Sequence, residues 1–93
     1  MRKYELVAVF PPEEELFRQG KEAVVAELAN QGAADVKETD MGDRPLAYTI
    51  KKKERGHYIL FTINFDPQRV TPAEKMFKLI PNLLKYLFVR AED

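Results

Sequence analysis

The sequence predicts an α+β fold in which one four-stranded antiparallel sheet carries two helices on one of its faces. Three observations lead to this prediction. Strand-like and helix-like segments follow one another in the order β-α-β-β-α-β. The two middle strands are joined by a short charged turn, KKKERG, as in a hairpin. The chain has 93 residues, enough for a modest core, so we expect a single domain over residues 1–93.

The first strand and first helix are read from residues 3–32. Residues 3–10, KYELVAVF, begin with polar and apolar residues in alternation and end apolar on both faces, which is typical of a central strand. Two prolines then end the strand, and three glutamates favour the start of a helix. Apolar residues recur at four-residue spacing until Gln31, and Gly32 is expected to cap the helix in the left-handed conformation.

The second and third strands form the expected hairpin. Residues 34–41 are a weak, polar strand, which we expect to continue over residues 44–51 after a kink or bulge at Gly42 and Asp43. Residues 57–65, HYILFTINF, make the most pronounced strand pattern of the chain, with isoleucine and phenylalanine along one face.

The second helix and last strand complete the pattern. The run Thr71-Pro72-Ala73-Glu74 predicts a capping box with proline at the first helical position, and Pro81 is expected to end this short helix. Residues 83–90, LLKYLFVR, form the last strand. The order βαββαβ predicts a ferredoxin-like topology with strand order 4-1-3-2, which puts the second strand at an edge. An edge strand tolerates Pro45, because proline cannot donate a ladder hydrogen bond.

Composition excludes several classes of protein. The chain has no cysteine, so a disulfide scaffold, a thiolate zinc site and a cysteine nucleophile are ruled out. We find neither a signal peptide nor an apolar run of membrane-spanning length, and expect a soluble cytoplasmic protein. Fifteen basic residues balance fifteen acidic ones, which argues against strong independent binding to nucleic acid but not against a local basic edge.

Catalytic chemistry has little support in the sequence. His57 is the single histidine, and no second histidine or acidic cluster gives it a metal or triad partner, so a structural role is favoured over a general base, a stacking group or a phosphate donor. No phosphate-loop or dinucleotide-binding motif occurs. We therefore expect no enzymatic activity, no cofactor and no metal.

A cluster of basic residues at the hairpin has two interpretations. It is either a solvated turn or, with two basic residues at the start of the first strand, a rim that contacts RNA phosphates. The candidate phosphate contacts are Arg2, Lys3, Lys51, Lys52, Lys53 and Arg55.

The sheet face without helices is a candidate protein-binding surface. Base stacking on it is not supported, because the aromatic signature of RNA-recognition modules is missing. An apolar patch on this face instead suggests a protein partner. The candidate partner residues are Val7, Val9, Tyr58, Leu60, Tyr86 and Phe88.

The motif GDRPLAYTIK, with MRKYELVAVF before it and GHY followed by an apolar strand after it, resembles the bacterial small-subunit ribosomal protein six family over nearly the whole chain. The matching motif positions are Gly42, Arg44, Leu46, Ala47, Tyr48, Ile50 and Lys51. Pro45 departs from the family, which usually carries a charged or amide side chain there.

The resemblance implies a non-catalytic ribosomal component. Members of that family bind the central domain of small-subunit ribosomal RNA together with ribosomal protein eighteen of the same subunit. Two alternatives stay open: a homo-oligomeric ferredoxin-like module that binds a small ligand, and an acylphosphatase-type hydrolase. The hydrolase would need a positioned arginine and asparagine in a phosphate-binding loop, and no glycine-rich loop follows the first strand.

Overall fold

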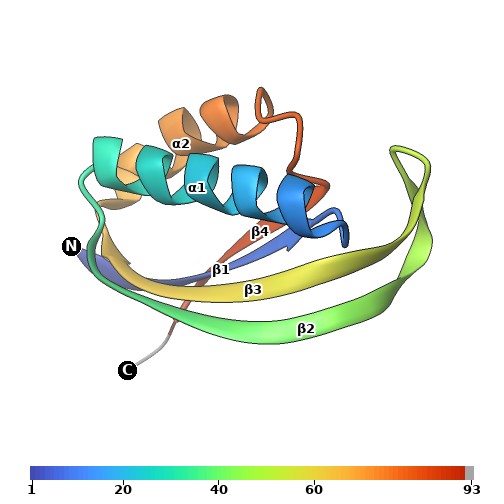
Figure 1. Cartoon of the computed structure of the whole chain (residues 1–93). Coiled ribbons are helices and arrows are strands. Elements are labelled where there is room, and N and C mark those ends of the chain that lie inside the picture. Colours follow the sequence, from blue (N-terminus) through green and yellow to red (C-terminus); the bar gives the residue numbers. More distant parts are fainter. Residues whose placement is uncertain (92–93) are drawn as a thin grey trace.

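The computed structural model describes residues 1–91 and shows a four-stranded antiparallel sheet with both helices on one face (Figure 1). The strands are arranged in the order β2-β3-β1-β4, which confirms the predicted ferredoxin-like topology. No helix in this described part of the chain is long and apolar enough to span a membrane. The elements are β1 (Arg2–Phe10), α1 (Glu14–Asn30), β2 (Ala34–Ile50), β3 (Lys53–Phe65), the 3-10 turn η1 (Pro67–Arg69), α2 (Val70–Phe77) and β4 (Lys85–Arg90).

The two central strands, β1 and β3, supply most of the core. Residues that pair directly, such as Leu6 and Phe61, point to the same face, and here that face lies under the helices. Burying each such side chain contributes about 1.5–3 kcal/mol. The expected apolar face of the third strand is confirmed, because Ile59, Phe61, Ile63 and Phe65 are all buried.

Helix α1 approaches its neighbours most closely at Gly20. A Cβ atom built on this residue would lie 2.2 Å from the carbonyl oxygen of Asn82 and 2.7 Å from Cδ1 of Phe10. The helix therefore accepts only glycine here without movement of the chain before β4. Its C-terminal end matches the expectation, because Gly32 has φ of 83° and its N–H donates to the carbonyl of Ala29.

We expect Gly20→Ala to destabilise the protein by about 2 kcal/mol, because the added methyl group overlaps a backbone carbonyl. Helix propensity alone predicts the opposite sign, a gain of about 1 kcal/mol. Urea unfolding of both proteins measures the difference. The matched control is Ala29→Gly on the exposed side of α1, which should cost about 1 kcal/mol by propensity alone. Unchanged or increased stability of Gly20→Ala would contradict the close approach.

Strand β2 lies at the sheet edge and is continuous through the predicted kink. The register against β3 shifts between Asp40 and Gly42, where Gly42 has φ of 85° and its N–H donates to Oδ1 of Asp40 at 2.8 Å. This is the expected bulge. Pro45 follows on β2, opposite Arg55 of β3. Because β2 is an edge strand, the missing N–H of this proline is tolerated, as predicted.

The second helix starts earlier than the capping box predicted. The chain turns at Asp66, whose side chain accepts a hydrogen bond from the N–H of Gln68 at 2.9 Å, and η1 leads directly into α2. Thr71 is consequently inside the helix rather than at its cap. Pro72 is still tolerated, because it lies in the first turn, where backbone N–H groups have no partner within the helix.

Candidate nucleic-acid interface

The tip of the β2–β3 hairpin is a two-residue turn made by Lys51 and Lys52. Ile50 pairs with Lys53 across it, and the two turn residues have φ of 48° and 66°. Left-handed backbone at both positions is the hairpin turn for which asparagine and glycine are preferred. Both lysines therefore lie at the end of the hairpin, which Figure 1 shows beyond the rest of the sheet.

Three of the four hairpin cations also have partners within the chain. Nζ of Lys53 pairs with Glu13 before α1, and this hydrogen bond holds the pKa of Glu13 below its ordinary value. Nε of Arg55 lies 3.0 Å from Oδ1 of Asp43. Nζ of Lys51 donates to the carbonyl oxygens of Pro81 and Leu83 at 3.4 and 3.2 Å. Among residues 1–91, Lys52 has no such hydrogen bond or ion pair, which makes it the most available phosphate ligand of the set.

The predicted single basic rim is wrong. Arg2 pairs with Phe65 and Lys3 with Asn64, at the end of β3 opposite the hairpin tip. The ten residues from Gly56 to Phe65 separate the two groups by roughly 30 Å. Figure 1 shows the N-terminus and the hairpin at opposite sides of the molecule. The six candidates thus form two separate sites, because β1 runs antiparallel to β3 and begins where β3 ends.

The sheet face without helices, here called the open face, carries three of the predicted partner residues with part of their surface exposed. Val7 pairs with Leu60 and, on its other side, with Leu87, so the three side chains form one row across β3, β1 and β4. Tyr58 extends this row toward the hairpin. Leu87 is 55% exposed and Val89 43%, and the sequence analysis missed both. The run KYLFVR is apolar on both faces, so its own pattern did not indicate which residues are exposed.

Tyr86 and Phe88 are not on the open face, so their prediction as partner residues is wrong. Phe88 pairs with Leu6 and Tyr86 with Ala8, residues that point into the core. The Phe88 ring stacks on the ring of Phe77 at a centroid distance of 5.8 Å. The β4 side chains that face away from the helices are instead those of Lys85, Leu87 and Val89.

Val9 faces away from the helices, as predicted, but it is only 2% exposed. A Cβ on Gly56 would lie 2.5 Å from Cγ1 of Val9 and 3.2 Å from Cδ2 of Leu46, so Val9 fills the space above this glycine. The distal part of β2 reaches across this end of the face, since the Lys85 ammonium lies 5.5 Å from the centre of the Tyr48 ring. Val9 is therefore unavailable to a partner, contrary to its prediction as a partner residue.

His57 has a structural environment. Its ring stacks on Phe17 at a centroid distance of 3.8 Å, and its Nε2 lies 2.7 Å from Oδ1 of Asp40. The hydrogen bonds from His57 and from the backbone N–H of Gly42 hold the pKa of Asp40 below its ordinary value. These contacts join β2, β3 and α1. Within residues 1–91 no cluster of three His, Cys, Asp or Glu side chains is arranged to hold a metal ion.

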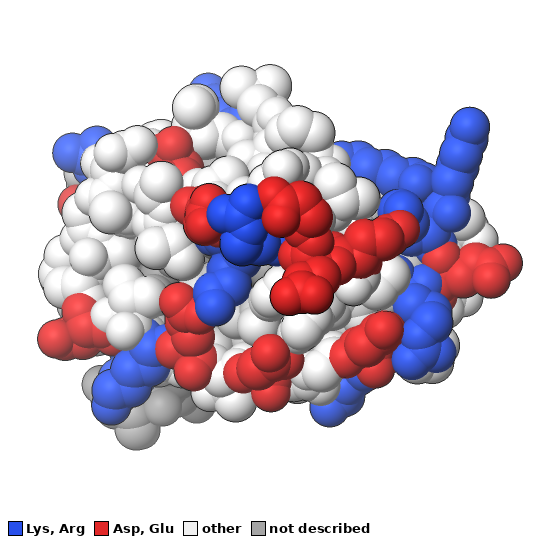
Figure 2. Space-filling model, in the orientation of Figure 1, with Lys and Arg blue, Asp and Glu red and all other residues white. Residues whose placement is uncertain are grey.

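The zero net charge hides an uneven distribution along the chain. Residues 14–30 and 34–50, which form α1 and β2, contain eight acidic and four basic residues, a formal charge of −4. The rest of the chain therefore carries +4. Figure 2 shows acidic side chains across the face that α1 presents and basic ones gathered at the hairpin end. Phosphates are accordingly favoured outside α1 and β2.

Comparison with known proteins gives a consistent result. The family model described as ribosomal protein S6 matches residues 3–90. Two relatives named small ribosomal subunit protein bS6 align over all 93 residues and their own full length: that of Treponema denticola is 50% identical and that of Treponema pallidum (strain Nichols) 44%. The crystal structure of 30S ribosomal protein S6 from Thermotoga maritima is 25% identical with a TM-score of 0.78, covering 97% of this chain and 87% of that one.

Proposed function

The chain belongs to the bacterial ribosomal protein S6 family, and we propose that it binds the central domain of small-subunit ribosomal RNA jointly with ribosomal protein eighteen. Family membership confirms the resemblance found in the sequence and identifies the chain as a structural component of the small ribosomal subunit. The RNA site and the partner are the proposed part.

The observation that carries the proposal is the exposed apolar row of Val7, Leu60 and Leu87 on the open face. A sheet face usually packs against another layer, and within residues 1–91 no helix covers this one. Val89 lies one row further along β4 and extends the patch. A contiguous exposed apolar surface of this kind is typical of a protein-binding site. The partner is thus expected to pack against the sheet rather than against α1 or α2.

Charge explains why a partner is needed. Phosphate neutralisation supplies most of the affinity for RNA, and proteins that bind without specific contacts reach only about 10⁻⁴–10⁻⁶ M at physiological salt. A chain with no net charge and two separate basic sites should bind RNA alone in that weak range. Burial of the open face against a second RNA-binding protein would supply the additional free energy.

The test is a titration of a fragment of the central domain of ribosomal RNA with each protein singly and with the equimolar pair. We expect the pair to bind at least about tenfold more tightly than this chain alone, because the two proteins share the cost of ordering the RNA. Equal affinity of this chain alone and of the pair would overturn the joint-binding proposal. A stable homodimer that blocks the partner would favour the homo-oligomeric alternative.

The hairpin should contribute a measurable number of phosphate contacts. Replacing Lys52 with glutamine is expected to reduce the slope of log affinity against log salt by about 0.7–0.9, the value for one phosphate contact. Thermal stability should stay unchanged, because Lys52 has no ion pair in the described structure. The control is Lys75→Gln, an exposed lysine of α2. A slope equal to that of the unmodified protein would support the solvated-turn interpretation.

A further inference from the structure

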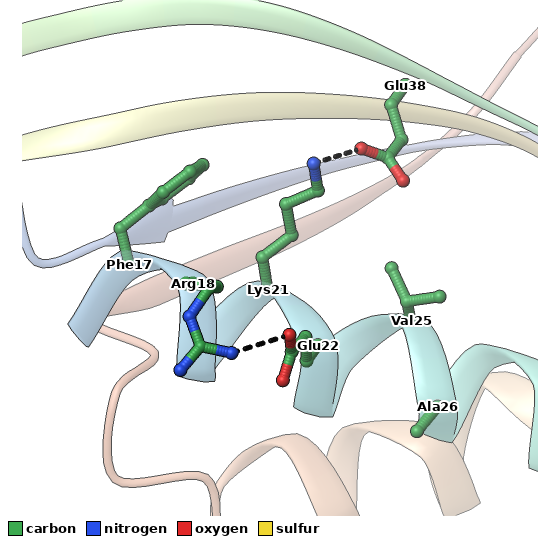
Figure 3. A pocket seen from close by; sticks show the side chains of 7 residues that line it. All are labelled: Phe17, Arg18, Lys21, Glu22, Val25, Ala26 and Glu38. Carbon is green, nitrogen blue, oxygen red and sulfur yellow. Dashed lines mark hydrogen bonds and ion pairs between the residues drawn. The ribbon is translucent and has the colours of Figure 1, made fainter. Parts of the chain in front are cut away.

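A groove runs between α1 and β2 on the helix side of the sheet (Figure 3). It has a volume of about 440 Å³ and is open to solvent. The helices cover the central strands, whereas β2 lies at the sheet edge and extends beyond α1. The groove lies between α1 and this edge strand. The lining residues are Phe17, Arg18, Lys21, Glu22, Val25 and Ala26 of α1 together with Glu38 of β2.

The groove holds two apolar side chains, Phe17 and Val25, with an ion pair between them and charged residues at its borders. Phe17, Lys21 and Val25 follow one another at four-residue spacing, and Figure 3 shows all three pointing from α1 toward the sheet. Val25 is 36% exposed although it lies on this side of the helix. Between the two apolar side chains, Nζ of Lys21 reaches across the groove to Oε1 of Glu38 at 2.7 Å.

Acidic groups outnumber basic ones along both borders. On α1 the single guanidinium of Arg18 is shared between Glu15 and Glu22. On β2, Asp40 lies two residues beyond Glu38 and so points to the same side of the strand. Four carboxylates thus face two cations, Arg18 and Lys21, and the imidazole of His57, whose Nε2 lies 2.7 Å from Oδ1 of Asp40. A partner that brings positive charge would be attracted to these acidic borders, whereas RNA phosphates would be repelled.

We propose that the groove between α1 and β2 docks an extended, basic segment of a second protein, in which aliphatic side chains alternate with lysine or arginine. An aliphatic side chain would pack against Phe17 and Val25, and its basic neighbours would compete with Arg18 and Lys21 for Glu22 and Glu38. An extended segment presents alternate side chains to opposite sides, which suits a narrow groove with one apolar wall and charged borders. This site is separate from the open face, on the other side of the sheet, and both can be occupied together.

The first measurement uses the full chain and a fluorescein-labelled eight-residue peptide of alternating lysine and leucine. Fluorescence anisotropy should show saturable binding, and a lysine–serine peptide of the same charge should bind at least about fivefold more weakly, because it lacks the apolar contact. Glu38→Lys should weaken binding of the lysine–leucine peptide about tenfold. The matched control is Glu54→Lys, the same change at an exposed residue near the hairpin tip, which should leave binding within about twofold. Equal losses in the two variants would reduce the effect to general charge attraction and overturn the proposal.

The second measurement locates the peptide by amide chemical shifts. Changes are expected on α1 around Val25 and on β2 around Glu38, and Leu87→Lys on the open face should leave the affinity for the peptide unchanged. Shifts centred on Leu60 and Leu87 instead would assign the peptide to the open face and overturn the groove site. Displacement of the peptide by an RNA fragment, with shifts on α1, would show that the groove binds nucleic acid and would equally contradict the proposal. Neither outcome affects the titration with ribosomal protein eighteen, so the two proposals fail independently.

Discussion

Changing Leu87 to lysine is expected to weaken joint binding of ribosomal RNA at least about hundredfold while leaving the fold intact. Leu87 is 55% exposed at the β4 end of the apolar row with Val7 and Leu60, so its replacement costs little in the isolated chain. In a complex packed on the open face, the same position would hold a buried ammonium group without a partner. An uncompensated buried charge costs about 3–5 kcal/mol, which corresponds to two or more orders of magnitude in affinity.

The matched control for this prediction is Leu79→Lys. Leu79 follows α2 on the helix side of the molecule and is 72% exposed, so it receives the same change of size and charge away from the open face. Joint binding is measured with the RNA fragment and ribosomal protein eighteen, and thermal unfolding checks that both variants are folded. If the two leucine variants bind alike, the open face is not the partner surface. Val9, buried under Leu46, does not offer this test.

Replacing Phe88 with alanine is expected to lower the free energy of unfolding by about 3 kcal/mol. Loss of a buried phenylalanine costs about 3–5 kcal/mol, and Phe88 belongs at the lower end because its ring is partly exposed. The ring packs against three other aromatic rings of the core, with centroid distances of 6.3 Å to Tyr4, 5.9 Å to Phe65 and 5.8 Å to Phe77. The deleted side chain would therefore leave a cavity beneath α2.

Urea unfolding of Phe88→Ala beside Leu87→Ala separates the two faces of β4. The neighbouring leucine points to the open face, and its loss should change stability by no more than about 0.5 kcal/mol. Adjacent residues of a strand lie on opposite faces of the sheet. The expected difference in unfolding free energy therefore arises because only the face with Phe88 packs on the core. A larger effect of Leu87→Ala would show that β4 has the opposite orientation, and equal effects would contradict the exposed position of Leu87.

Local patterns were sufficient for the element order and for the core faces of two strands. Alternation along HYILFTINF identified the helix-facing side of β3. Only the odd-numbered positions from Ile59 to Phe65 carry large apolar side chains throughout. The strand order placed the second strand at an edge, which explained Pro45, and Gly42 and Asp43 indicated a kink or bulge within that strand. The start of α2 was misplaced, because Asp66 and the turn after it provide a cap that competes with the capping box at Thr71.

The candidate sites depended on contacts between distant segments, which local patterns describe less well. The separation of Arg2 from the hairpin follows from antiparallel pairing of β1 with β3 and was open to inference from the topology. Burial of Val9 could not be inferred in this way, because the distal part of β2 lies at this end of the open face: Leu46 is near Gly56, and the Tyr48 ring lies 5.5 Å from the ammonium of Lys85 on the opposite edge strand. The acidic character of α1 and β2 was readable from the sequence, once these segments are counted apart from the rest.

The sequence by itself determined the fold class, the strand order and the family, because hydrophobic periodicity, turn residues and the motif around Gly42 are all local features. Only the tertiary structure decided which side chains of β4 remain exposed. Both faces of that strand carry apolar residues, so its sequence pattern is compatible with either face turned toward the helices. Pairing of Phe88 with Leu6 selects one of them, because directly opposed residues share a face, and this places Leu87 rather than Phe88 on the open face.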